Sequence, residues 1–143
     1  MSLKDAYWDS SALVPLCISQ PQSAKARVFY DRYRIVAWWA TQVEIISGLT
    51  RLERMGQISH DQFLVGKQLA WDLIQSWYSV GSLGIATEAC TLLELYPLRA
   101  ADALQLAAAL EVCAHRPRGS VFITADQRLA DAARRAGFTV EFL

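Results

Sequence analysis

The sequence has no excess of charge of either sign, and this limits the partners that it can attract. Its 143 residues include 14 Lys and Arg against 14 Asp and Glu, which gives a formal net charge of zero. Proteins that bind nucleic acid through a general electrostatic field carry a clear positive excess. Any polyanionic ligand must therefore be held by local groups of residues.

Cysteine and histidine are scarce. The three cysteines, Cys17, Cys90 and Cys113, are widely separated, and only Cys113 has a histidine, His115, nearby in the sequence. No pair has the CxxC or HxxxH spacing of a zinc site, so zinc binding is not expected. The cysteines are odd in number and lie among apolar residues, which predicts reduced thiols in the core of a cytosolic protein.

Long hydrophobic runs and glycine-rich phosphate loops are also missing. No apolar segment approaches the roughly 20 residues that span a membrane, and the N-terminal MSLKDAYW does not resemble a signal peptide. Neither GxGxxG nor a P-loop occurs, which argues against a nucleotide-binding module. We expect a cytoplasmic protein with a single domain, residues 1–143, because this length and 53% hydrophobic content suffice for one core.

The sequence does contain short apolar strands that alternate with longer helical segments. Strands are predicted at 6–8, 34–40, 120–124 and 138–143, helices at 11–18, 22–33, 41–55, 59–77, 85–96, from after Pro97 to about Cys113, and 125–137, and a turn at 81–84. Continuously apolar strands are typical of a sheet that is covered on both faces. The pattern predicts an α/β fold with a central parallel sheet flanked by helices.

Four acidic residues stand at or near predicted helix starts. Asp9 and Asp126 each follow a predicted strand, Glu44 lies in the first turn after Thr41, and Asp102 lies near the start of its helix. In an open parallel sheet, the strand carboxyl ends and the helix amino ends share one edge, where ligands bind. At least Asp9 and Asp126 are therefore expected to converge.

Each acid also has a purely structural explanation. Thr41 and Glu44 match a capping box, Asp9 and Asp126 are suited to cap the helices that follow them, and Asp102 is a favourable first-turn charge. Capping does not require the acids to converge, whereas two carboxylates about 4 Å apart repel by roughly 4 kcal/mol at an effective dielectric constant near 20. A cluster therefore needs a cation or raised pKa values. Oxygen ligands without histidine favour Mg²⁺ or Mn²⁺, whose chemistry suits phosphodiester hydrolysis.

Four segments together, YWDSSALV, TQVEIISGLTRLERMGQIS, LRAADALQLAAAL and VFITADQRLADAARRAGFTV, resemble the PIN-domain ribonucleases, in particular the VapC-type toxins of toxin–antitoxin pairs. The resemblance runs from about residue 8 to residue 140. It implies a Rossmann-like parallel sheet and an endoribonuclease in which a metal-activated water hydrolyses RNA, leaving 5′-phosphate and 3′-hydroxyl ends. It implies that one or two Mg²⁺ or Mn²⁺ ions are held by Asp9, Glu44, Asp102 and Asp126. A homodimer and a cognate antitoxin protein are the implied partners.

Three further positions take their interpretation from this resemblance. Ser11 and Thr124 match family positions whose hydroxyls orient the acids or the metal-bound waters. Gln105 stands where many relatives have His, one turn after Asp102. This difference affects either substrate contacts or the geometry around the acids.

Contacts to RNA are expected from local arginines, because the chain has no general positive field. Arg51, two turns beyond Glu44, and Arg99 are the preferred candidates, since the guanidinium group suits phosphate. Arg134 and Arg135 are expected to be ordinary solvent-exposed residues. Base stacking, core packing and interface contacts all remain open for Trp38, Trp39, Trp71 and Trp77.

Two other interpretations of the acids remain open at this stage. A non-catalytic PIN-like module that binds RNA or protein would share the fold, and metal-dependent turnover would separate it from an enzyme. A phosphatase of the haloacid-dehalogenase type would use Asp9 as a covalent nucleophile. It needs a second acid two residues later, where this chain has Ser11.

Overall fold

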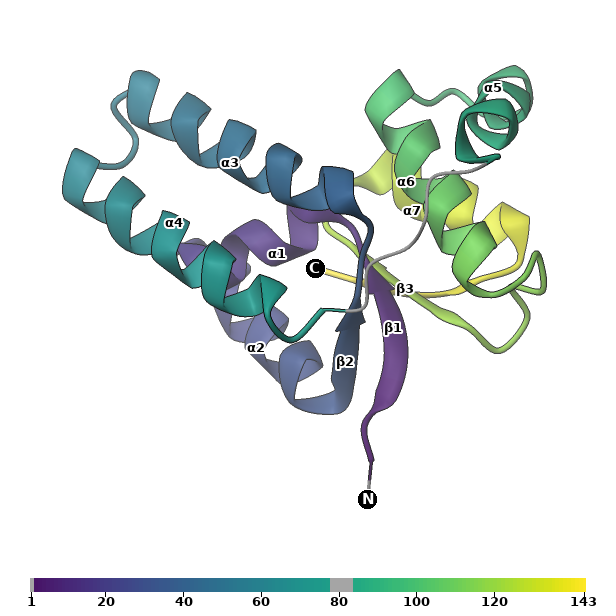
Figure 1. Ribbon diagram of the computed structural model, residues 1–143, viewed down its shortest axis with the longest axis horizontal. Coiled ribbons are helices and arrows are strands. Elements are labelled where there is room, and N and C mark those ends of the chain that lie inside the picture. Colours follow the sequence, from purple (N-terminus) through teal and green to yellow (C-terminus); the bar gives the residue numbers. More distant parts are fainter. Residues whose placement is uncertain (1, 78–83) are drawn as a thin grey trace.

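A computed structural model describes residues 2–77 and 84–143, and its centre is a four-stranded parallel sheet between two groups of helices (Figure 1). The strands are β1 (Lys4–Trp8), β2 (Tyr33–Val36), β3 (Val121–Thr124) and β4 (Thr139–Phe142), in the order β2-β1-β3-β4. The helices in the described residues are α1 (Ser10–Cys17), α2 (Ser23–Arg32), α3 (Trp39–Arg54), α4 (His60–Ile74), α5 (Ile85–Leu95), α6 (Ala100–Val112) and α7 (Gln127–Ala136). The predicted α/β fold with a parallel sheet is confirmed.

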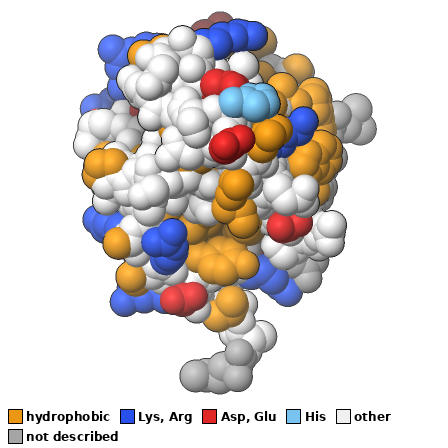
Figure 2. Space-filling model, turned by 90° about the vertical axis from the view of Figure 1, so that its left-hand side faces the viewer, with side chains coloured by type: hydrophobic (Ala, Val, Ile, Leu, Met, Phe, Trp, Pro, Cys, Tyr) orange, Lys and Arg blue, Asp and Glu red, His pale blue; other side chains and the backbone are white. Residues whose placement is uncertain are grey.

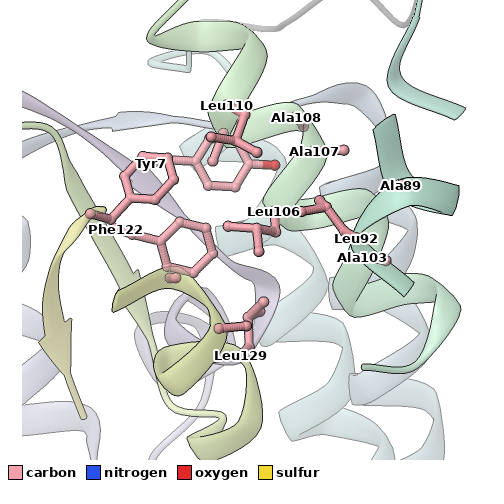
Figure 3. Packing of buried hydrophobic residues seen from close by; sticks show 14 of the residues in the cluster. Tyr7, Ala89, Leu92, Ala103, Leu106, Ala107, Ala108, Leu110, Phe122 and Leu129 are labelled. Atoms are coloured by element: carbon pink, nitrogen blue, oxygen red, sulfur yellow. The ribbon is translucent and has the colours of Figure 1, made fainter. Parts of the chain in front are cut away.

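Both faces of the sheet are buried, and neighbouring strand residues serve different cores. Ala6 and Trp8 pack in the core formed with α1–α4, whereas Tyr7 between them packs in the core formed with α5, α6 and α7. In that second core the rings of Tyr7 and Phe122 stack 5.5 Å apart, and Leu106 of α6 lies against them (Figure 3). Because side chains alternate across a strand, a strand covered on both sides must be apolar throughout.

The boundary between β2 and α3 differs from the prediction. The sequence predicts one strand over 34–40, but β2 ends at Val36 and α3 begins at Trp39. β2 pairs only with β1, and the last paired residues are Tyr7 and Val36. The chain leaves β1 after Trp8, so a longer β2 would have no partner for its backbone groups, and the β-forming tendency of this segment is overridden.

This earlier start of α3 changes the position of its acid. Trp38 is the N-cap residue, and Thr41 lies inside the first turn, where its N–H donates to the Trp38 carbonyl (3.0 Å). The capping box predicted for Thr41 and Glu44 is therefore wrong. Glu44 lies in the second turn of α3, beyond the residues that a helix cap serves.

Most other helix boundaries agree with the prediction. Ser59 caps α4 in a capping box with Gln62, and Gly137 ends α7 in the left-handed conformation at φ 113°. α4 ends at Ile74, three residues before the predicted end, and the turn predicted at 81–84 falls mostly outside the described residues. No helix in the described ranges has the length and apolar character needed to cross a membrane.

The cysteines occupy three different environments. All three are free, with Cys17 buried, Cys113 half-buried and Cys90 exposed on α5. Burial raises the pKa of the Cys17 thiol to about 12, so this thiol stays protonated at neutral pH. The prediction of a core position is right for Cys17 and wrong for Cys90, which lies on the solvent side of its amphipathic helix.

Candidate active site

The predicted acids gather at the carboxyl edge of the sheet, where β1 and β3 lie side by side. The chain continues from β1 to β2 on one side of this pair and from β3 to β4 on the other, so strand order changes direction here. Asp9 directly follows β1, and its N–H donates to the carbonyl of Ile123 in β3 (2.9 Å). Asp126 follows β3 by two residues. Such a switch point is the usual ligand-binding position in an open parallel sheet.

Asp9 is the most enclosed of the four acids, with an exposed fraction of 4%. Its Oδ2 atom accepts hydrogen bonds from the Ser11 hydroxyl, from the Thr124 hydroxyl (3.0 Å) and from the Ser11 N–H (3.3 Å). The same hydroxyls accept from the loop after β3, since the Ala125 N–H donates to Ser11 (2.9 Å) and the Asp126 N–H to Thr124 (3.0 Å). Ser11 and Thr124 thus tie Asp9 to the segment that carries Asp126.

Glu44 reaches the same region from α3. Its Oε2 atom accepts a hydrogen bond from the Ser10 hydroxyl (2.8 Å). The pKa of Glu44 is raised to about 7, chiefly by burial and further by the negative charges of Asp9 and Asp102, while the Ser10 hydroxyl and the nearby Gln105 side chain offset part of this rise. Glu44 therefore shares one electrostatic environment with these two acids.

Mutual repulsion also connects the remaining acids. Burial raises the pKa of Asp9 to about 6 in spite of its hydrogen bonds, and the charge of Asp102 contributes to this rise. Burial raises the pKa of Asp102 as well, and Asp126 adds to it, while Arg99 and Arg128 lower it. The structure thus brings the four predicted acids into one coupled group at one edge of the sheet.

Some of these acids also stabilise helix ends. Asp9 is the N-cap of α1, Asp126 is the N-cap of α7 and accepts from the Leu129 N–H (3.0 Å), and Asp102 lies in the first turn of α6. The predicted caps at Asp9 and Asp126 are confirmed. The partial positive charge of three helix amino ends offsets part of the repulsion among the carboxylates, so capping and clustering are compatible.

The donor set suits a hard divalent cation. All four side chains offer carboxylate oxygens. The raised pKa values of Asp9, Glu44 and Asp102 reflect burial and repulsion that a cation would relieve. Within residues 2–77 and 84–143, no three Asp, Glu, His or Cys side chains lie close enough to form a ready-made metal centre. The carboxylates would have to move closer together to share an ion, as repelling charges do when a counterion arrives.

The arginines near the acids are only partly those that the sequence predicts. Arg99 is the N-cap residue of α6, and its charge lowers the pKa of Asp102. Arg128 in the first turn of α7 also lowers the pKa of Asp102. Its position four residues after the strand VFIT places it near the same edge of the sheet, but the sequence analysis did not prefer it as an RNA contact. Arg51 is exposed and lines a groove along α3, two turns beyond Glu44.

Gln105 is fully buried, which rules out direct contact with a substrate. Its Oε1 atom accepts from the Tyr7 hydroxyl (2.6 Å), and its Nε2 atom donates to the Thr41 hydroxyl (3.3 Å). Of the two effects considered for this position, only a change in the geometry around the acids agrees with the structure. Sequence reasoning missed Tyr7, Thr41 and Ser10, because their roles depend on contacts between distant segments.

Comparisons with known proteins agree with this architecture. A family model described as PIN domain matches residues 6–135. Among solved structures, the crystal structure of PAE2754 from Pyrobaculum aerophilum matches with a TM-score of 0.68 and 17% sequence identity, covering 96% of this chain and 89% of that chain. At this identity the likeness concerns the fold alone. No curated protein matches the sequence.

Proposed function

Because the chain belongs to the PIN-domain family, whose members are generally nucleases, we propose that it is a Mg²⁺- or Mn²⁺-dependent endoribonuclease and the toxin of a toxin–antitoxin pair. The observation that carries the proposal is the coupling of Asp9, Glu44, Asp102 and Asp126 at one edge of the sheet. Caps alone would not require Asp102 to raise the pKa values of Asp9 and Glu44, or Asp126 to raise that of Asp102. Phosphodiester hydrolysis does require oxygen ligands gathered around a cation.

In this proposal the four acids hold the cation, and the surrounding residues hold the acids. Among the described residues, Ser11 and Thr124 donate three hydrogen bonds to Asp9 Oδ2 and fix the carboxylate, so we assign Oδ1 as the atom that would bind the cation. A divalent ion, when bound there, lowers the pKa of water and neutralises charge on the phosphate. Arg99 and Arg128 lie beside Asp102 and are placed to bind phosphate oxygens of the RNA.

The decisive experiment measures cleavage of a mixed set of labelled RNAs by the purified protein with Mg²⁺, with Mn²⁺ or with EDTA. Cleavage should require metal and leave 5′-phosphate ends, which distinguishes it from contaminating nucleases that use the RNA 2′-hydroxyl. Metal should also raise the melting temperature in the absence of RNA. A folded protein that neither cleaves RNA nor is stabilised by metal would contradict the proposal and favour the non-catalytic binding module.

Arg99→Gln is expected to weaken RNA binding without altering the fold, because Arg99 is exposed and its side chain caps no helix. Loss of one phosphate contact should reduce the slope of log Kd against log salt concentration by about 0.7 for single-stranded RNA. Fluorescence anisotropy measures this in an Asp102→Asn background, where the RNA stays intact. Arg51→Gln tests the second predicted contact in the same way.

Arg135→Gln is the matched control, since Arg135 is exposed in the last turn of α7, at the opposite end from Asp126. It removes the same charge far from the acids and should leave the salt dependence unchanged. Equal slopes for Arg99→Gln and Arg135→Gln would contradict a specific role for Arg99.

The proposed toxin also needs protein partners, namely a second copy of the chain and an antitoxin. Large apolar side chains are exposed on α3 and α4, including Trp39, Val43, Val65 and Trp71. Figure 2 shows the side of the molecule at the outer ends of these helices, where hydrophobic side chains lie among charged ones. Apolar surface of this kind supports a protein interface. A solution mass near twice 16.0 kDa would support the homodimer, and a monomer would contradict it.

A further inference from the structure

Three buried polar side chains meet beside the acids, and each comes from a different element. They are Tyr7 of β1, Thr41 of α3 and Gln105 of α6, which are 3%, 0% and 0% exposed. Figure 3 shows the Tyr7 ring reaching from β1 toward α6, among the apolar side chains of the core. Polar groups in such a position destabilise the fold unless each finds a partner.

The Tyr7 hydroxyl determines which way the Gln105 amide faces. A tyrosine hydroxyl is protonated at neutral pH, and the Tyr7 hydroxyl donates to Gln105 Oε1. Its 2.6 Å contact with Gln105 has the length of an O–H···O bond and is short for N–H···O. The amide oxygen must therefore face Tyr7, and the amide nitrogen must face the opposite way.

The opposite side of the amide is the side of α3 and the acidic group. Nε2 donates one hydrogen bond to the Thr41 hydroxyl (3.3 Å), and an amide nitrogen has a second N–H to donate. Thr41 lies on α3 three residues before Glu44, and the Gln105 side chain lies close enough to the Glu44 carboxylate to lower its pKa. Hydrogen bonds thus lead from Tyr7 through Gln105 to Thr41, on the helix that carries Glu44.

We propose that Gln105 is a positioning residue of the acidic site, which holds the Glu44 carboxylate in place for cation binding while Tyr7 fixes the orientation of Gln105. Gln105 touches neither substrate nor cation in this arrangement, because it is fully buried. The Ser10 hydroxyl of α1 donates to Glu44 Oε2, so in this proposal Glu44 is supported from both α1 and α6. This inference rests on the proposed function, since it assigns Glu44 a cation to bind.

The test measures Mn²⁺ binding to metal-free protein by electron paramagnetic resonance, together with kcat, KM and melting temperature. Gln105→Met keeps the length of the side chain and removes both polar atoms, and Tyr7→Phe removes only the orienting hydroxyl. Each should weaken Mn²⁺ binding by about tenfold, the usual size for loss of a group that supports a metal ligand. Since they act in sequence, the double variant should be no weaker than Gln105→Met alone.

The matched control is Leu106→Val, the next residue of α6 and also fully buried. It should lower the melting temperature through lost packing and leave Mn²⁺ binding unchanged. Wild-type Mn²⁺ affinity in Gln105→Met would overturn the inference. A double variant whose loss of Mn²⁺ affinity equals the product of the two single losses would also overturn it. Should Gln105→Met fail to fold, wild-type affinity in Tyr7→Phe would overturn it. Wild-type protein that binds no Mn²⁺ and cleaves no RNA would instead overturn the proposed function.

Discussion

Asp102→Asn is expected to reduce metal-dependent RNA cleavage by at least about 100-fold, more than the loss of a group that only supports a ligand. The charge of Asp102 raises the pKa of both Asp9 and Glu44, so Asp102 interacts with both of these acids. The amide is nearly the same size as the carboxylate but carries no charge to attract a cation. The measurement is kcat/KM on a cleavable RNA with Mg²⁺ and with Mn²⁺, alongside the Mn²⁺ dissociation constant.

Glu111→Gln is the control for this prediction, because Glu111 is an exposed acid in the last turn of the same helix. Nine residues of helix separate it from Asp102 by about 13 Å. It removes the same charge from α6 and should leave cleavage and metal binding unchanged. Equal activity of Asp102→Asn and wild-type protein would remove Asp102 from the site, and equal losses in both variants would indicate a general charge effect.

The stability of the metal-free protein is expected to fall as pH rises, and Asp9 should cause a large part of this fall. Its pKa is about 6 in the folded chain against an ordinary value of 3.8, so between these values the folded state binds more protons than the unfolded state. Stability therefore decreases as pH rises from about 4 to about 6. Above pH 6 the full cost of the buried charge amounts to about 3 kcal/mol. Glu44 acts in the same direction up to its pKa of about 7.

Asp9→Asn isolates this effect. The variant should be more stable than wild-type protein by up to about 3 kcal/mol at pH 7.5, with a difference that disappears near pH 4. Asn keeps an oxygen that can accept from Ser11 and Thr124, so the cap of α1 is preserved. Urea denaturation in EDTA at several pH values measures the free energy of unfolding, and Mn²⁺ at pH 7.5 should stabilise only the wild-type protein.

Asp72→Asn provides the comparison for a carboxylate on the exposed surface of α4. Its free energy of unfolding should follow the wild-type curve at every pH. A stability difference between Asp9→Asn and wild-type protein that stays constant with pH would show that burial of Asp9 does not govern its titration.

The sequence predicts the parts of this protein that depend on local pattern. Continuously apolar strands indicate a sheet covered on both faces, and acids placed after strands indicate a shared edge. The segment RIVAWWA is misassigned because its β-forming residues extend beyond the end of the partner strand β1 at Trp8. Gln105 cannot be assigned to the interior from sequence, because its burial depends on a hydroxyl 98 residues away. Arg128 is underused for a related reason, since its proximity to Asp102 exists only in the folded chain.

The pairing of β1 with β3 joins segments from opposite ends of the chain. Asp9 and Thr124, linked by a hydrogen bond, are 115 residues apart in sequence. Such distant contacts form late, because the intervening segments must first be made and folded. A chain still on the ribosome therefore has Asp9, Glu44 and Asp102 before the strand that completes their edge. Under the proposed function, synthesis of residues 121–143 completes the nuclease, and a translation product that ends before β3 leaves cellular RNA intact.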